Sequence, residues 1–299
     1  MSLITEKSNI KSKGIDKKPV LEVLKIMNEE DKLVAYAVEK ELSNIAKAVE
    51  KIIESFKIGG RLVYIGAGTS GRLGILDASE CPPTFSTDKD QVIGIIAGGM
   101  KAVTDAIEGA EDNSLAGKED LVKIGLTEKD IVVGVTANGN TPYVLGAMEY
   151  ANNIGATTIG LSCNQDSKIT KIATISITPI VGPEVITGST RLKAGTAQKM
   201  VLNMLSTASM IGMGKVYNNL MVDLNPSNIK LMNRAKRIIM EATGVEEEEA
   251  ERHLKLSNNK PKVAIVMIEA RCSYEKAIEL LEKNNGSIYK AIAAEDSAK

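Results

Sequence analysis

Short apolar runs and amphipathic segments alternate along the chain before residue 180. Five runs are largely apolar and rich in β-branched residues, as strands buried on both faces of a sheet are: 61–65, 92–97, 131–136, 157–161 and 173–177. Between them the pattern predicts helices at about 70–78, 101–110, 118–124 and 142–154. This alternation predicts an α/β fold with a parallel sheet covered by helices on both faces. In such folds, ligands bind beyond the carboxyl ends of the strands.

Helical patterns occupy the rest of the chain. Residues 31–56 predict one long amphipathic helix, and residues 190–215 predict a helix that is apolar around most of its surface, as in a core or a subunit interface. Asn225-Pro226-Ser227 is interpreted as a junction, with Ser227 as a helix cap. We therefore expect a larger domain at 1–225 and a small helical domain at 226–299. We expect three to five short helices and no strand in the small domain, with helical patterns at 228–242, 246–256, 261–270, 274–284 and 286–294.

The amino-acid composition argues against nucleic acid and membranes as binding partners. The chain is 43% hydrophobic and 25% charged, which is ordinary for a soluble globular protein, and its formal net charge is −1. The absence of a basic excess and of Trp argues against binding to nucleic acid, and no charge field favours a membrane surface. No run approaches the roughly 20 apolar residues that span a bilayer. The polar N-terminus lacks the apolar core of a signal peptide, so we expect a cytoplasmic protein.

Cysteine and histidine are too scarce for several kinds of catalytic site. Cys81, Cys163 and Cys272 are far apart and form no CxxC motif, so we expect neither disulfides nor a zinc site. Cys81 could be a nucleophile, but no histidine is near it in the sequence, which favours a small buried thiol. The single histidine, His253, cannot supply several metal ligands, and we expect no metal. Acid–base chemistry would then fall mainly to Glu, Asp, Lys or Tyr.

A glycine-rich turn, GAGTSG at 66–71, follows the first predicted strand. Its glycine spacing fits the dinucleotide-binding fingerprint. That fingerprint also requires an acidic residue at the end of the second strand, which here ends in IAGG at 96–99, so a nicotinamide or flavin cofactor is disfavoured. Beside Gly68, the hydroxyls of Thr69 and Ser70 and free backbone N–H groups at a helix N-terminus suit a sugar or a phosphate. A simple capped turn would not require two hydroxyls in a row.

A second polar loop, TANGNTP at 136–142, follows the third predicted strand. Asn138, Gly139, Asn140 and Thr141 precede a proline at the start of a helix, which again can build an anion cradle. A plain helix-capping loop is the alternative. Two cradles after neighbouring strands favour one shared pocket for a phosphorylated sugar.

Two glutamates are candidates for acid and base. Glu80 is expected at the end of the helix that begins at the first cradle, where Cys81-Pro82-Pro83 would break it. Glu111 is expected at the end of the helix after the second strand. A carboxylate at a helix C-terminus is disfavoured by the dipole, which raises its pKa, as a general acid requires. From spacing alone, either glutamate could be a surface carboxylate. By the same criterion, Glu108 and Asp112 are equally good candidates for the acid or the base.

Longer motifs make the sequence recognisable: GAGTSGRLGILDASECPPT at 66–84, EGAED at 108–112 and GSTRLKAGTAQK at 188–199. With these the chain resembles the N-acetylmuramic acid 6-phosphate etherase family, whose members have a sugar isomerase (SIS) domain, from about Ile4 to the C-terminus. The resemblance implies a five-stranded parallel sheet of the flavodoxin-like type, a phosphosugar-binding catalytic domain at 1–225 and a homodimer. It implies that the D-lactyl ether of N-acetylmuramate 6-phosphate is cleaved to N-acetylglucosamine 6-phosphate and D-lactate, without a cofactor.

The resemblance also assigns residues. The family's two catalytic glutamates fall on Glu80 and Glu111. By analogy Glu80 protonates the departing lactyl oxygen and later activates water, and Glu111 removes the C2 proton. The third motif supplies further expected substrate contacts, Ser189 and Lys193.

One loop departs from the family pattern. The family usually has ASGRTP after the third strand, and here Asn138 replaces the serine and Asn140 the arginine. Loss of a positive charge and a hydroxyl would weaken phosphate binding or change which phosphosugar fits. Two other functions remain open. A phosphosugar-sensing SIS regulator needs the cradles but not the glutamates, and an aldose–ketose isomerase removes the C2 proton but expels no group from C3.

Overall fold

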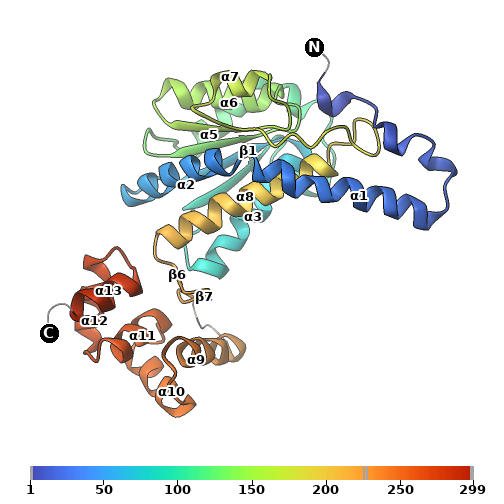
Figure 1. Cartoon of the computed structure of the whole chain (residues 1–299). Helices are drawn as coiled ribbons and strands as arrows, with labels where there is room; N and C mark the ends of the chain where they lie inside the picture. Colours follow the sequence, from blue (N-terminus) through green and yellow to red (C-terminus); the bar gives the residue numbers. More distant parts are fainter. Residues whose placement is uncertain (1–2, 225, 227, 297–299) are drawn as a thin grey trace. The chain divides into compact units, whose positions relative to one another are not determined.

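The computed structural model describes residues 3–224, 226 and 228–296 (Figure 1). The predicted junction residue Asn225 and the predicted cap Ser227 lie outside the described residues. The chain forms two compact units, Met1–Ser79 with Lys89–Ser206 and Glu80–Asp88 with Thr207–Lys299. The chain passes between the units within helix α3 (Gly68–Phe85), again between Asp88 and Lys89, and within helix α8 (Lys193–Gly212). The division into functional domains at 225/226 stays a prediction.

A five-stranded parallel sheet forms the centre of the first unit, as predicted. Its order is β2-β1-β3-β4-β5, and all neighbouring pairs are parallel. Figure 1 shows α5, α6 and α7 on one face and α2, α3 and α8 on the other. The strands are β1 (Leu62–Gly66), β2 (Val92–Ile96), β3 (Ile131–Val135), β4 (Thr157–Leu161) and β5 (Ile175–Ile177). The helices that cover the sheet, beside α3 and α8, are α2 (Leu42–Lys57), α5 (Ser114–Lys123), α6 (Pro142–Asn153) and α7 (Lys168–Ile172).

The strand order places a topological switch point beside β1. This strand pairs with β2 on one side and β3 on the other, and the chain leaves β1 toward β2 but leaves β3 toward β4, so the connections that leave β1 and β3 diverge. The turn after β1 is tight, because a Cβ added at Gly66 would lie 2.7 Å from the backbone nitrogen of Gly71. Gly68 begins α3 with a φ of +54°, which favours glycine. These glycines bring the N-terminus of α3 directly onto the carboxyl end of β1.

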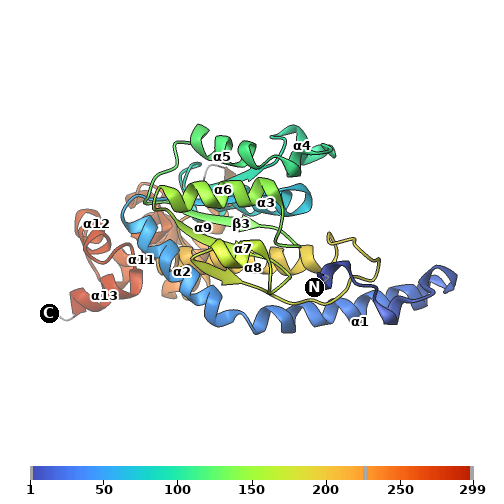
Figure 2. The same ribbon diagram turned by 90° about the horizontal axis from the view of Figure 1, so that it is seen from above.

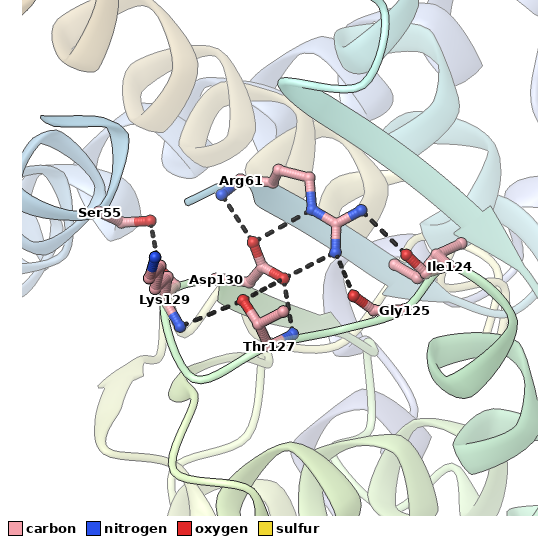
Figure 3. Close-up of polar contacts among 7 residues, drawn as sticks. All are labelled: Ser55, Arg61, Ile124, Gly125, Thr127, Lys129 and Asp130. Atoms are coloured by element: carbon pink, nitrogen blue, oxygen red, sulfur yellow. Dashed lines mark hydrogen bonds and ion pairs between the residues drawn. The ribbon is translucent and has the colours of Figure 1, made fainter. Parts of the chain in front are cut away.

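An ion pair joins the amino-terminal ends of the neighbouring strands β1 and β3 (Figure 3). Arg61, before β1, donates from Nε to Oδ1 of Asp130 at 3.1 Å and from Nη2 to Oδ2 at 2.8 Å. Asp130, before β3, also accepts from the backbone N–H groups of Arg61 and Thr127, at 2.8 and 2.9 Å. Burial alone would raise the pKa of Asp130, but the bonds from Arg61 and Thr127 outweigh it and hold that pKa below its ordinary value. The pair therefore fixes the starts of β1 and β3 relative to each other.

The predicted helix at 31–56 is two helices, α1 (Val20–Glu39) and α2. The break at Lys40 and Glu41 contains neither Gly nor Pro, so the sequence carries no breaker there. The carboxylate of Glu41 accepts from the side chains of Asn44, at 2.9 Å, and Thr178, at 3.3 Å, and these contacts stabilise a separate start for α2. Both views show α1 extending beyond the edge of the sheet (Figure 2).

The expected ends of two helices are wrong. The prediction that Cys81-Pro82-Pro83 breaks the first helix fails, because α3 continues through both prolines to Phe85. The fixed φ of proline is itself helical, although each proline removes one backbone N–H donor. After the two prolines, the N–H of Ser86 still bonds the carbonyl of Pro82 at 2.9 Å. The helix expected at 101–110 is reduced to α4 (Lys101–Thr104), followed by a loop. Gly109, with a φ of +74°, interrupts helical geometry. Glu111 therefore lies in the 3-10 helix η4 (Ala110–Asp112), just before α5, and not at a helix C-terminus.

The second unit is mainly helical, and a helix is present at each of the five helical patterns of the sequence. A two-stranded antiparallel hairpin, β6 (Val216–Tyr217) with β7 (Leu220–Met221), precedes them and was not predicted. Asn228 caps the first helix by accepting the N–H of Leu231 at 2.9 Å. The helices are α9 (Ile229–Thr243), α10 (Glu247–Leu256), α11 (Pro261–Glu269), α12 (Tyr274–Lys283) and α13 (Ile288–Asp296), around a core of their own. Within the described residues, no helix combines the length and apolar composition that a membrane crossing requires.

Candidate active site at the switch point

The first predicted cradle lies where expected, between β1 and α3. Gly68, Thr69 and Ser70 form the first turn of α3, whose N–H groups have no partners within the helix itself. Ser70 is buried and donates its hydroxyl to Oε1 of Gln198 on α8 at 2.9 Å. The backbone N–H groups and the positive end of the helix dipole make this turn suited to an anion.

The second cradle lies between β3 and α6. Asn138 accepts on Oδ1 from the hydroxyl of Thr136 at 3.2 Å and from the N–H of Asn140 at 2.8 Å, which shapes the loop. The hydroxyls of Thr136 and Thr141 are 2.7 Å apart. Asn140 turns away, since its Oδ1 accepts the N–H of Lys168 at the start of α7 at 3.1 Å. Gly139 packs against Ser167, the residue before α7. A Cβ added at Gly139 would lie 2.2 Å from Oγ of Ser167. Asn140 and Gly139 thus support the loop rather than line the cavity described next.

Both cradles open into one cavity of about 240 Å³. Six of the predicted site residues line it, and none of its described lining residues is Lys or Arg. Hydroxyls, backbone amides and carboxylates therefore set its chemistry. The lining residues are Glu6, Ala67, Gly68, Thr69, Ser70, Glu111, Val135, Thr136, Ala137, Asn138, Thr141 and Thr190.

Glu111 also lines a neighbouring cavity of about 190 Å³, together with Arg72, Asp105 and Glu108. Arg72 on α3 donates to the carbonyls of Val103, at 2.9 Å, and Asp105, at 3.0 Å. This arginine thereby ties the segment that leads to Glu111 onto the first helix after β1. Of the candidate carboxylates, Glu111 is the one that faces the cavity between the cradles.

Glu80 is not brought to these cavities. It is exposed, lies in the second compact unit and lines neither of the two. On α3 it comes twelve residues after Gly68. Cys81, beside it, is buried, as expected for a small apolar thiol.

Lys193 and Ser189 also lie outside the lining. Lys193 is 1% exposed, and its Nζ donates to Oε2 of Glu30 on α1 at 2.6 Å. Burial would raise the pKa of Glu30, but hydrogen bonds from Lys193, Lys11 and Asn9 lower it to about 2. Lys193 therefore forms a buried ion pair with Glu30, and its contact with substrate stays a prediction. Thr190, next to Ser189, lines the cavity instead.

Sequence reasoning missed three residues at the site: Glu6, Thr190 and Gln198. Thr190 is adjacent to a predicted residue in the third motif, and Gln198 belongs to that motif. Glu6 lies in a polar N-terminal segment whose spacing shows no periodicity, so no local signal marks it. Among the residues that the structure describes, no group of three or more His, Cys, Asp or Glu could hold a metal ion.

Comparisons with known proteins show which family the chain resembles. The SIS domain family matches residues 112–208, and the glucokinase regulatory protein N-terminal SIS domain matches residues 44–152. A relative from Geobacillus sp. (strain WCH70), named N-acetylmuramic acid 6-phosphate etherase, is 58% identical over 97% of this chain and 98% of its own length. A relative of the same name from Clostridium botulinum (strain Okra / Type B1) is 60% identical over 97% of this chain and 96% of its own.

The chain belongs to the N-acetylmuramic acid 6-phosphate etherase family. The resemblance inferred from the three motifs is thus confirmed. A solved structure from Bacteroides fragilis NCTC 9343, described as a phosphosugar isomerase involved in capsule formation, superposes with a TM-score of 0.51. It is 19% identical and covers 67% of this chain and 95% of its own length, so it shows a shared fold alone.

Proposed function

We propose that this protein cleaves the D-lactyl ether of N-acetylmuramic acid 6-phosphate, giving N-acetylglucosamine 6-phosphate and D-lactate. The observation that carries the proposal is the cavity in which Glu111 faces two anion cradles at the switch point. The names of relatives that are 58–60% identical over nearly their whole length support the choice of reaction.

The cradles would hold the phosphate without a cationic side chain. Free N–H groups at the start of α3 and its dipole favour a dianion. The hydroxyls of Thr69 and Thr141 and the amide of Asn138 lie in the same lining and can donate to phosphate oxygens. Because Asn140 replaces the arginine of the family pattern and is bound to α7, phosphate affinity depends on these neutral donors.

The reaction proposed is an elimination followed by a hydration. Opening of the sugar ring exposes the C1 aldehyde, which acidifies the C2 proton because the carbanion delocalises onto the carbonyl. Glu111 removes that proton, the C2 electron pair forms a double bond to C3, and the C3–O bond breaks. Glu80 protonates the departing lactyl oxygen and then takes a proton from water as it adds to C3. A proton returned to C2 completes N-acetylglucosamine 6-phosphate.

This division of roles needs a second carboxylate at the cavity that holds Glu111. Glu80 of the same chain lines neither cavity and belongs to the second compact unit. We therefore propose a homodimer in which Glu80 of the partner subunit reaches the sugar held beside Glu111. Helix α1 carries apolar side chains that suit burial against a second copy. They are Val20, Leu21, Leu24 and Tyr36, which are 55–75% exposed.

Incubation of the protein with N-acetylmuramate 6-phosphate and an enzymatic assay for D-lactate tests the proposal. We expect release of D-lactate, and we expect Glu111→Gln and Glu80→Gln each to reduce turnover by about 10²-fold or more. Glu119→Gln, an exposed carboxylate on α5 outside both cavities, is the matched control. Formation of a ketose phosphate without D-lactate would indicate an isomerase, and binding without turnover would indicate a sensor.

A further inference from the structure

A second carboxylate reaches the cavity from a distant part of the chain. Glu6 lines the cavity together with Thr69, Glu111 and Thr190. Its carboxylate lies against the loop before α8, where a Cβ added at Gly188 would be 3.8 Å from Oε2. Glu6 is solvent-exposed, and no cation in the described part of the chain forms an ion pair with it. The carboxylate is therefore free to interact with a bound molecule.

The backbone around Glu6 is fixed on both sides. The N–H of Ile4 donates to Oδ1 of Asn164 at 2.8 Å, and Nδ2 of Asn164 donates to Thr5 Oγ1 at 3.1 Å. Thr5 is 1% exposed. After Glu6, the side chain of Asn9 donates to Glu30 at 2.8 Å and to the carbonyl of Pro183 at 3.1 Å. These bonds hold the segment against the loops that follow β4 and β5, so the position of Glu6 is built into the fold.

The charge of Glu6 determines what it can bind. A carboxylate repels a phosphate but accepts strong hydrogen bonds from a hydroxyl or an amide N–H. The lining of the cavity therefore combines anion-binding cradles with two hydrogen-bond-accepting carboxylates, Glu6 and Glu111. A molecule that carries both a phosphate and neutral hydrogen-bond donors suits both kinds of lining group.

We infer that Glu6 is a specificity-determining residue, which accepts hydrogen bonds from hydroxyl or amide N–H groups of the sugar and orients it with its phosphate toward Thr69. The inference rests on the proposed function for the identity of the sugar phosphate. Glu6 would then be a substrate contact that lies outside both cradles.

Two ligands distinguish this role from a structural one. We would measure the binding of N-acetylglucosamine 6-phosphate and of inorganic phosphate by calorimetry, for the unmodified protein, Glu6→Ala and Glu6→Gln. Loss of a hydrogen bond to a charged group should weaken sugar phosphate binding about 10- to 100-fold in Glu6→Ala. Inorganic phosphate should bind equally well or more tightly, because a like charge is removed. Glu22→Gln, an exposed carboxylate on α1 paired with Lys18, should change neither.

If Glu6→Ala binds both ligands more weakly by the same factor, Glu6 only supports the cradles. That result would overturn the inference. Unchanged binding of the sugar phosphate would overturn it as well. The proposed reaction fails separately, if the unmodified protein binds the sugar phosphate but releases no D-lactate from N-acetylmuramate 6-phosphate. If the unmodified protein binds neither ligand, both are refuted.

Discussion

Replacement of Asp130 by alanine tests how strongly the ion pair between Arg61 and Asp130 stabilises the sheet (Figure 3). The side chain of Asp130 is 2% exposed and that of Arg61 is 22% exposed. Asp130→Ala would leave the guanidinium and the N–H groups of Arg61 and Thr127 without their acceptor. Breaking a buried ion pair costs about 3–5 kcal/mol, and the partial exposure of Arg61 favours the lower end, about 3 kcal/mol. A unit of this size loses about 2–4 °C in Tm per kcal/mol, so we expect a loss of about 6–12 °C.

Thermal unfolding followed by circular dichroism measures the effect, with Glu54→Gln as control. Glu54 forms an exposed pair with Lys51 and should contribute less than about 1 kcal/mol. Because the folded pKa of Asp130 is lowered, its contribution is present above its unfolded pKa of about 3.9 and is lost as the pH falls through the folded value. The difference between Asp130→Ala and the unmodified protein should therefore shrink in acid. A Tm loss under about 2 °C at pH 7 would refute the argument.

Two further predictions concern the surroundings of the site. Glu30→Gln should destabilise the protein by about 3 kcal/mol at pH 7, since the pKa falls from 4.5 to about 2 at 1.36 kcal/mol per unit. In urea unfolding this difference should disappear as the pH falls from about 4 toward 2, and a constant difference would contradict it. Gly139→Ala should raise KM about tenfold, because a left-handed φ and contact with Ser167 strain the second cradle. Gly14→Ala, with a similar φ but open space, should leave KM unchanged.

The sheet could be predicted because its strands β1 and β3 are buried on both faces and the sequence records that burial directly. The runs of Val and Ile in β1 and β3 need no long-range information, and the glycine-rich exits mark the carboxyl ends. The ends of the helices were harder to predict than the strands. Pro82 and Pro83 look like breakers, but their φ suits a helix, and α3 continues. The break between α1 and α2 depends on contacts of Glu41 with side chains elsewhere, which no local pattern reveals.

The cradles could likewise be predicted, because hydroxyls and glycines at strand exits are a local signal. The side chains that come from elsewhere could not. Lys193 has the charge of a phosphate ligand, yet its position at the start of α8 lets it reach Glu30 on α1. Glu6 enters the cavity only because its segment is bonded to Asn164, far along the sequence. Such residues are determined by tertiary contacts, not by spacing within a motif.

The central claim is that Glu111 of one copy and Glu80 of another act on the same sugar. Mixing Glu80→Gln and Glu111→Gln subunits after reversible dissociation tests this claim directly, with D-lactate release from N-acetylmuramate 6-phosphate as the readout. If the site is shared, half of the dimers are mixed and each contains one intact site, so about a quarter of the unmodified activity should return. Activity of the mixture no greater than that of the separate variants would contradict the account.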